Sequence, residues 1–185
     1  MSSTRAAGVS LAQLPNALTI ARLVVLPVFV VLLLAGDDGH SWPAAIVFAA
    51  AGITDQVDGF LARRWQVESA FGKIADPLAD RLLIDAAVLL LWLDGRLPWV
   101  ALAIVLGRDA VLLAGYKAVV PRGYDFAVNT LGRASTVLLY SALALTMATG
   151  SGTAWPLWLF WIGVAVALAA GLLYVRKAWR KVVQR

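Results

Sequence analysis

The stretch DQVDGFLARRWQVESAFGKIADPLAD, residues 55–80, concentrates charged side chains in a chain that is otherwise largely apolar. Hydrophobic residues make up 61% of the sequence, whereas soluble domains contain about 45–50%. Strongly apolar segments lie on both sides of the stretch, so its carboxylates need a specific explanation.

The 185 residues include no Cys and a single His, His40. The absence of Cys excludes disulfides, a thiolate nucleophile and a Cys-ligated metal, and one His cannot form a multi-histidine metal site. Any metal ion must therefore be held by oxygen ligands. A net charge of +5 in so apolar a chain indicates anchoring on the cytoplasmic side of a membrane and binding of anionic lipid or phosphate. Nucleic acid is not expected as a partner.

Six apolar segments are each long enough to cross a bilayer, for which a helix needs roughly 20 residues. They cover residues 17–35, 42–61, 71–93, 99–119, 126–147 and 155–175. We therefore predict an all-α integral membrane protein, a bundle of six transmembrane helices that forms one domain over residues 1–185. Residues 1–16 are expected to be an N-terminal juxtamembrane segment, and residues 176–185 a basic cytoplasmic tail. No cleavable signal peptide is expected, because no small-residue cleavage pattern follows the first apolar run.

The distribution of basic residues predicts the orientation of these helices. Residues 37–39, 94–95 and 150–152 have the composition of tight loops on one side of the membrane. Of the 16 Lys and Arg residues, only Arg96 falls in or beside those loops. Positive charge accumulates on the cytoplasmic side, so both termini are expected in the cytoplasm.

Four carboxylates within residues 55–80 have a spacing that suits helices. Asp55 and Asp58 are three residues apart, and Asp76 and Asp80 are four apart, so each pair shares one helix face. A short link between antiparallel helices would bring the two faces together, and four unpaired negative charges would repel one another. Divalent cations remove that repulsion, and carboxylate oxygens without His or Cys suit Mg²⁺ or Mn²⁺.

Two glycines and an arginine in the same stretch predict a site for a diphosphate. Gly59 and Gly72 each cost a helix about 1 kcal/mol relative to alanine, which is tolerable where a ligand or a neighbouring backbone approaches closely. Arg63, two turns beyond Asp55, can bind a phosphate through two hydrogen bonds. Each feature alone has a simpler explanation, because glycines pack membrane helices and Asp–Arg pairs are common at helix ends.

The stretch resembles the signature of the CDP-alcohol phosphatidyltransferase family. That signature reads D-x-x-D-G-x-x-A-R, about eight further residues, and then G-x-x-x-D-x-x-x-D. Its specified positions are all filled, by Asp55, Asp58, Gly59, Ala62, Arg63, Gly72, Asp76 and Asp80. The resemblance covers nearly the whole chain. It implies an enzyme of phospholipid synthesis that transfers the phosphatidyl group of CDP-diacylglycerol to an alcohol and releases CMP.

The resemblance also implies roles for individual residues. Two Mg²⁺ ions, or Mn²⁺ in their place, are expected at Asp55, Asp58 and Asp76, with Asp80 near the second metal. The residues implied to bind the CDP-lipid are Asn16, Thr19, Gly59, Arg63, Ser69 and Gly72, although Asn16 and Thr19 are equally well explained as a helix cap and a helix hydroxyl. Asp80 resembles the general base, which takes the proton of the acceptor hydroxyl as its oxygen attacks the lipid-side phosphorus. CMP leaves, and its negative charge is stabilised by the metals and Arg63.

The acceptor alcohol is indicated by weaker features. Glycerol-3-phosphate enzymes commonly carry Gly-Arg-Glu in the fourth span and another Arg eight residues later, whereas this chain has Arg108-Asp109 and Tyr116. The segment LGRAST, residues 131–136, also lacks their Lys-Thr pair. Both features resemble cardiolipin synthases, so phosphatidylglycerol is the expected acceptor and glycerol-3-phosphate the alternative. Candidates for binding the acceptor phosphate are Arg108, Lys117, Arg122 and Arg133; Lys117 and Arg122 equally suit cytoplasmic anchoring, and Arg108 suits an ion pair with Asp109.

A second class of function stays open, a divalent-cation transporter with the aspartates as its ion path. Such paths place acidic residues near the midplane of the membrane. Here the acids lie at the expected cytoplasmic end beside Arg63 and Arg64, which favours a phosphate ligand. The expected partners are CDP-diacylglycerol, phosphatidylglycerol or glycerol-3-phosphate, the lipid bilayer and a second copy of the chain as a homodimer. The expected location is the cell membrane, multi-pass, with the active site on the cytoplasmic side.

Overall fold

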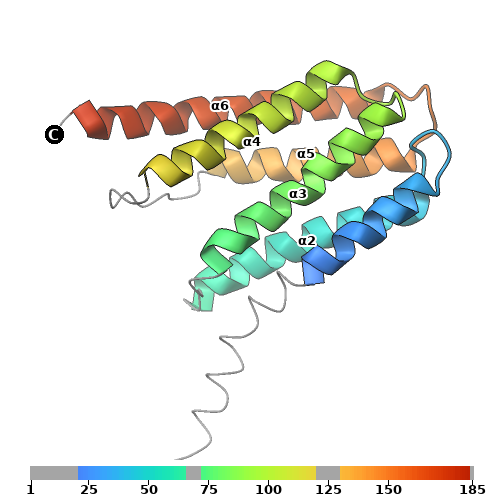
Figure 1. Cartoon of the computed structure of the whole chain (residues 1–185), viewed down its shortest axis with the longest axis horizontal. Helices are drawn as coiled ribbons and strands as arrows, with labels where there is room; N and C mark the ends of the chain where they lie inside the picture. Colours follow the sequence, from blue (N-terminus) through green and yellow to red (C-terminus); the bar gives the residue numbers. More distant parts are fainter. Residues whose placement is uncertain (1–20, 66–71, 120–129, 184–185) are drawn as a thin grey trace, which may run out of the picture.

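The computed structural model describes residues 21–65, 72–119 and 130–183, and within them the side chains of residues 21–57, 81–112, 130–173 and 176. These described residues form helices and contain no strand. An N-terminal helix, Ala21–Leu34, precedes α2 (Trp42–Trp65), α3 (Gly72–Leu93), α4 (Trp99–Val119), α5 (Thr130–Ala148) and α6 (Trp155–Val183). Figure 1 shows the helices as long rods joined by short loops at one end of the molecule.

The predicted apolar segments correspond to these helices, and the all-α class is confirmed. The helices α2, α3 and α4 begin and end within four residues of the predicted segments. The last helix, α6, continues beyond the predicted segment to Val183, so most of the predicted basic tail extends the helix. Among the residues that the structure describes, two stretches of helix could cross a membrane by length and composition, Thr130–Ala148 and Trp155–Leu173.

Three glycines close the predicted tight loops. The φ angles of Gly39, Gly95 and Gly152 are 68°, 70° and 100°. These values lie in the left-handed region, where a side chain is strained and glycine is not. The loops that composition predicts at residues 37–39, 94–95 and 150–152 are therefore sharp turns.

Arg96 joins these loops to one another. Its guanidinium donates hydrogen bonds to the carbonyl oxygens of Thr146 at 2.7 Å and Thr149 at 2.9 Å, at the end of α5, and to that of Asp38 at 3.3 Å. The last carbonyls of a helix have no partner within it, so a cationic donor stabilises them. Partial burial lowers the pKa of Arg96, while Asp94 and Asp38 raise it. The three loops are thus held together at the end of the bundle opposite the facing ends of α2 and α3 (Figure 1).

Ser41 caps the start of α2 and ties it to its neighbours. Its hydroxyl accepts a hydrogen bond from the amide of Ala44 at 3.3 Å and donates one to the carbonyl of Leu32 at 2.9 Å. A serine before the first turn commonly satisfies an amide that has no partner within the helix. The amide of Ser41 also donates to the carbonyl of Met147 at 2.9 Å, which fixes the start of α2 beside the end of α5.

A row of aromatic rings sets α2 in the core. Phe29 of the N-terminal helix, Phe48 of α2 and Tyr140 of α5 are buried, with ring centroids 5.2 Å and 4.8 Å apart. Tilted rings at such distances attract one another beyond the burial of their area. Phe48 lies two helical turns before Asp55, so the row fixes the helix that carries the first motif aspartate.

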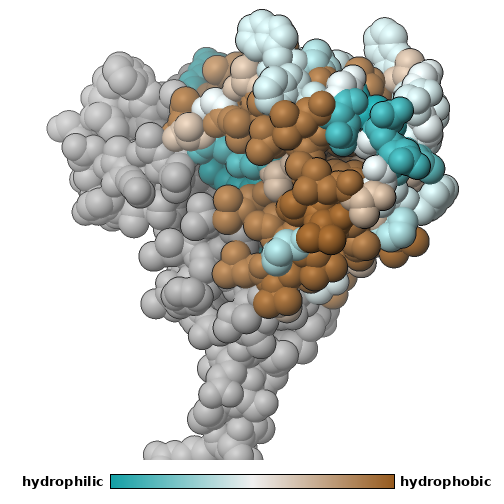
Figure 2. Space-filling model, turned by 45° about the vertical axis from the view of Figure 1, so that its right-hand side comes forward, coloured by the Kyte–Doolittle hydropathy of each residue, from teal (hydrophilic) through white to brown (hydrophobic). Residues whose placement is uncertain are grey.

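Large apolar side chains also cover much of the outer surface. Val31, Ile53, Trp158 and Leu172 expose 64%, 65%, 72% and 72% of their area. Figure 2 shows a broad apolar face on which such residues gather. Apolar surface on this scale indicates contact with lipid or with another protein.

Candidate active site

Asp55 is the motif carboxylate whose surroundings the structure describes. Its Oδ1 lies 2.8 Å from Nη2 of Arg22, which comes from the N-terminal helix. The two side chains are 16% and 9% exposed, so this is a largely buried ion pair. It links the segment that precedes α2 directly to the first position of the signature.

The other motif residues are placed by their backbone. Asp58, Gly59 and Arg63 follow Asp55 within the unbroken helix α2. The predicted second half of the motif opens α3, with Gly72 as its first residue and Asp76 and Asp80 in its first three turns. The helices α2 and α3 contact each other, so the two halves of the motif lie on neighbouring helices.

Three predicted residues lie outside the described residues, namely Asn16, Thr19 and Ser69. The structure describes only the backbone of Asp58, Arg63, Asp76 and Asp80. The surroundings of Gly59 and Gly72 are likewise outside the described part. The predicted roles of all these residues in binding the CDP-lipid or metal remain predictions. What is confirmed is that the helical spacing assumed for the four aspartates exists in α2 and α3.

The oxygen ligands that the motif offers fit a hard divalent cation. The signature offers carboxylate oxygens, the ligands that Mg²⁺ and Mn²⁺ prefer. The one histidine, His40, belongs to a loop at the opposite end of the bundle. Among the described side chains alone, no group of three His, Cys, Asp or Glu residues is placed to hold a metal ion. The carboxylates that the signature offers for a metal ion come from both α2 and α3.

A second polar cluster lies between α3 and α4. Nη1 of Arg81 donates a 3.4 Å hydrogen bond to the backbone carbonyl of Asp109, and Nε of Arg108 lies 3.3 Å from Oδ1 of Asp109. Asp85 faces the charges of Asp109, Arg81 and Arg108. Two positive and two negative charges are thus gathered at one helix contact, and the cluster as a whole is neutral.

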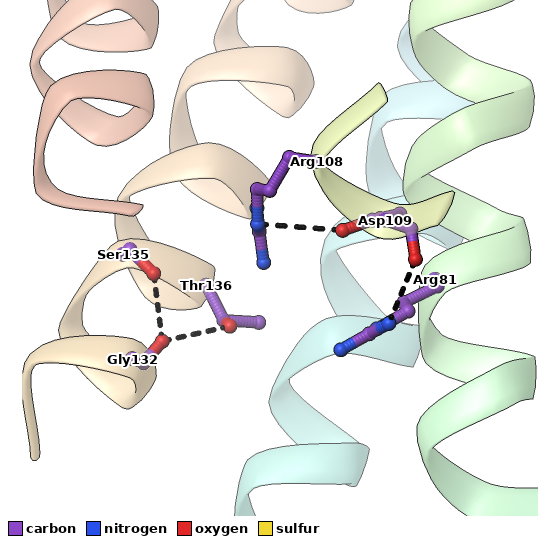
Figure 3. A network of polar contacts seen from close by, with 6 residues as sticks. All are labelled: Arg81, Arg108, Asp109, Gly132, Ser135 and Thr136. Atoms are coloured by element: carbon purple, nitrogen blue, oxygen red, sulfur yellow. Dashed lines mark hydrogen bonds and ion pairs between the residues drawn. The ribbon is translucent and has the colours of Figure 1, made fainter. Parts of the chain in front are cut away.

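This α3–α4 cluster is not fully hydrogen-bonded. Oδ1 of Asp85, Nε of Arg108 and Oδ1 of Asp109 are buried and make no hydrogen bond with other described residues. Arg108 and Asp109 are neighbours in the chain, so they point about 100° apart around α4 and meet with poor geometry. In Figure 3 the guanidinium of Arg108 extends away from Asp109, in the direction of the part of α5 that carries Ser135 and Thr136. The guanidinium of Arg108 can therefore donate further hydrogen bonds to an anionic ligand.

The remaining acceptor candidates differ in their surroundings. Arg133 is exposed near the start of α5. Lys117 belongs to the last turn of α4, although its side chain is outside the described residues, and Arg122 lies wholly outside them. Of the four candidates, Arg108 is the one that the structure places in a buried polar setting.

Neither Arg22 nor Asp85 is among the site residues predicted from the sequence. Arg22 was visible as the last residue of the segment PNALTIAR, residues 15–22, but its partner depends on how two helices cross. An arginine inside an apolar run is a usable signal, because such a residue normally has a functional partner. Asp85 carries the same signal, since it lies in the apolar part of α3.

Comparison with known proteins identifies the class of enzyme. The chain belongs to the CDP-alcohol phosphatidyltransferase family, whose model matches residues 12–169. It is therefore a transferase of phospholipid biosynthesis. Family membership favours the enzyme over the cation transporter.

Three of the relatives carry three different names. The chain is 37% identical over 183 residues to a cardiolipin synthase (CMP-forming) of Streptomyces coelicolor, covering 91% of this chain and 84% of the relative. It is 34% identical to a probable phosphatidylglycerophosphate synthase of Mycobacterium tuberculosis, covering 93% and 84%. It is 33% identical to a CDP-diacylglycerol–glycerol-3-phosphate 3-phosphatidyltransferase of Bacillus subtilis, covering 90% and 95%. The comparison establishes the reaction class and leaves the acceptor to be determined.

Proposed function

We propose that this enzyme transfers the phosphatidyl group of CDP-diacylglycerol to phosphatidylglycerol, which forms cardiolipin and CMP. The observation that carries the proposal is the placement of the four motif aspartates on two contacting helices, in a chain of this family. The acceptor oxygen forms a bond to the lipid-side phosphorus. The bond from that phosphorus to the oxygen of CMP breaks, and CMP leaves with the electron pair.

Residues of α2 and α3 have distinct tasks in this reaction. Asp80 takes the proton of the attacking hydroxyl, and Arg63 binds the diphosphate of the donor. Asn16, Thr19, Gly59, Ser69 and Gly72 complete the donor site in this proposal. Asp55, Asp58, Asp76 and Asp80 would hold two Mg²⁺ ions, which neutralise the negative charge of the diphosphate when bound.

We place the reaction at the cytoplasmic end of a six-helix membrane bundle. The exposed apolar side chains on the described helices support the membrane setting, because apolar surface on this scale marks a contact with lipid or with another protein. The three loops held by Arg96 form one end of the bundle, and the motif lies toward the other end. Only one of the 16 Lys and Arg residues, Arg96, falls in or beside these loops in the sequence, which supports a cytoplasmic active site at the other end.

The charge of the α3–α4 cluster favours phosphatidylglycerol over glycerol-3-phosphate. The phosphodiester of phosphatidylglycerol carries one negative charge, whereas a phosphate monoester carries nearly two at neutral pH. Arg108 already shares its charge with Asp109 and Asp85. A partly neutralised guanidinium suits the monoanion better than the dianion. Glycerol-3-phosphate remains the alternative, supported by the names of several relatives.

An acceptor panel tests the proposal. Enzyme purified in detergent is supplied with radiolabelled CDP-diacylglycerol and with phosphatidylglycerol, glycerol-3-phosphate or no acceptor. CMP release and lipid products are then separated by chromatography. Labelled cardiolipin with phosphatidylglycerol is the expected result. CMP release supported by glycerol-3-phosphate alone would make the enzyme a phosphatidylglycerophosphate synthase, and no CMP release with either would reject both acceptors.

A further inference from the structure

The ion pair between Arg22 and Asp55 has features that surface ion pairs lack. Arg22 as a whole residue is 8% exposed, and the contact distance of 2.8 Å is that of a charge-assisted hydrogen bond. Two charges taken out of water stabilise a protein only weakly as a pair, but a charge left alone there is strongly destabilising. Arg22 therefore supplies positive charge directly to a largely buried carboxylate.

We propose that Arg22 is the internal counter-ion of Asp55, and that it competes with a divalent cation for this carboxylate. The inference rests on the proposed metal site, in which Asp55 is a ligand. In the metal-free enzyme Arg22 neutralises Asp55 and keeps the N-terminal helix joined to α2. A cation that binds Asp55 must then either share the carboxylate with Arg22 or displace the guanidinium from it.

Two opposing effects determine whether Arg22 raises or lowers the affinity of the site for its cation. A hydrogen-bonded group behind a metal ligand orients it, and losing such a group typically lowers metal affinity about 10- to 100-fold. Repulsion between Arg22 and a cation on the same carboxylate acts in the other direction. Two unit charges about 4 Å apart at an effective dielectric constant of about 20 change an equilibrium by roughly a thousand-fold, and a divalent ion doubles that interaction. Repulsion is the larger effect, so Arg22 lowers the affinity of the site for its cation.

The competition has a consequence for the metal-free enzyme. Replacing Arg22 by a neutral residue leaves the carboxylate of Asp55 in a buried place without the charge that Arg22 supplies. The metal-free protein loses stability as a result. A bound cation restores the missing positive charge, so the variant gains more from the cation than the wild-type enzyme does.

The test measures Mn²⁺ binding by electron paramagnetic resonance and thermal unfolding, both on full-length protein in detergent without substrates. Arg22→Gln is expected to bind Mn²⁺ at least about 10-fold more tightly than the wild type, and to show a larger rise in melting temperature on saturation. Arg22→Lys keeps the charge and is expected to stay within about three-fold of the wild-type affinity. Arg176→Gln, which removes an exposed positive charge from α6, is the matched control and should leave the affinity unchanged.

Each other outcome rejects a specific claim. Affinity for Mn²⁺ that is equal or weaker in Arg22→Gln would overturn the competition while leaving the metal site intact. A wild-type enzyme that binds no Mn²⁺ would overturn the proposed metal site and this inference with it. If Arg22→Gln folds only when the cation is present, the competition is supported. If it fails to fold even in saturating Mn²⁺, the cation cannot replace Arg22 and the inference is wrong.

Discussion

Gly52 of α2 lies directly against the ring of Tyr140 of α5. A Cβ atom at position 52 would be 2.5 Å from Cδ1 of Tyr140 and 2.8 Å from its Cγ, closer than real Cβ atoms approach other atoms. Tyr140 is buried and packed on Phe48, so its ring has little room to move. Gly52 is three residues before Asp55, so this contact restrains α2 about one turn before the motif.

We expect Gly52→Ala to destabilise the protein. Overpacking costs about 1–3 kcal/mol, which exceeds the gain of about 1 kcal/mol from replacing a helical glycine. Thermal unfolding in detergent measures the change. The control is Gly171→Ala in α6, where a Cβ would meet nothing within 4 Å, so that variant should be neutral or more stable. Equal melting temperatures for the two variants would mean that Tyr140 yields without cost.

Arg96→Met should lower stability without impairing catalysis. The substitution removes charge-assisted hydrogen bonds to Thr146 and Thr149 and leaves carbonyls at the end of α5 without their donor, at a cost of about 2–3 kcal/mol. The melting temperature should fall, while kcat at low temperature should stay within about two-fold, because Arg96 lies at the end of the bundle away from the motif. A loss of kcat with unchanged stability would contradict this structural role.

Chelation of divalent cations should abolish activity, because the motif supplies carboxylate ligands. Activity should return on addition of Mg²⁺ or Mn²⁺. Asp55→Asn and Asp76→Asn should each lose metal affinity together with turnover, as measured by Mn²⁺ binding. Turnover that survives exhaustive EDTA treatment, or full metal affinity in both variants, would show that the ligands are elsewhere.

Asp80→Asn should lower kcat by a factor on the order of 10²–10⁴, the usual contribution of a general base. The change keeps the shape of the side chain and removes its basicity. The KM for CDP-diacylglycerol should change much less, because three carboxylates and Arg63 remain. Steady-state kinetics at saturating acceptor provide the measurement. Near-normal turnover would remove Asp80 from the role of base, and a collapse of donor binding would make it a ligand only.

Asp109→Asn should shift the acceptor preference toward glycerol-3-phosphate. The carboxylate 3.3 Å from Nε of Arg108 is lost, so the guanidinium presents more of its positive charge to a dianionic phosphate. The ratio of kcat/KM for glycerol-3-phosphate to that for phosphatidylglycerol is expected to rise by about 10-fold, equivalent to about 1.4 kcal/mol. Asp94→Asn, an exposed change in the loop after α3, is the control and should leave the ratio unchanged. An unchanged ratio in both variants would remove Arg108 from the acceptor site.

Much of the fold was predictable because it depends on patterns local in the sequence. Long apolar runs predict the helices, and glycine in short polar segments predicts the turns at Gly39, Gly95 and Gly152. The four aspartates were predictable as two helical pairs for the same reason. The boundaries of α6 were less predictable, since its basic end is not apolar and yet continues the helix.

The contacts that position the candidate site depend instead on how the helices cross. Arg22 meets Asp55 only because the N-terminal helix lies along α2 at one particular rotation, and no spacing in the sequence encodes that rotation. The contact of Gly52 with Tyr140 has the same origin. The partners of Arg96 are backbone carbonyls, which every residue carries, so the sequence could not indicate them.

The length of α6 has a consequence for how the enzyme meets its lipids. Its 29 residues extend roughly 43 Å, whereas the hydrocarbon of a bilayer is about 30 Å thick. In the proposed orientation its last turns therefore project as a stiff rod through the headgroup layer, with basic residues at positions 176, 177, 180 and 181. Each such charge near an anionic leaflet contributes about 1 kcal/mol of attraction. These charges would enrich acidic lipids around the enzyme, and phosphatidylglycerol, the acceptor proposed above, is one of them.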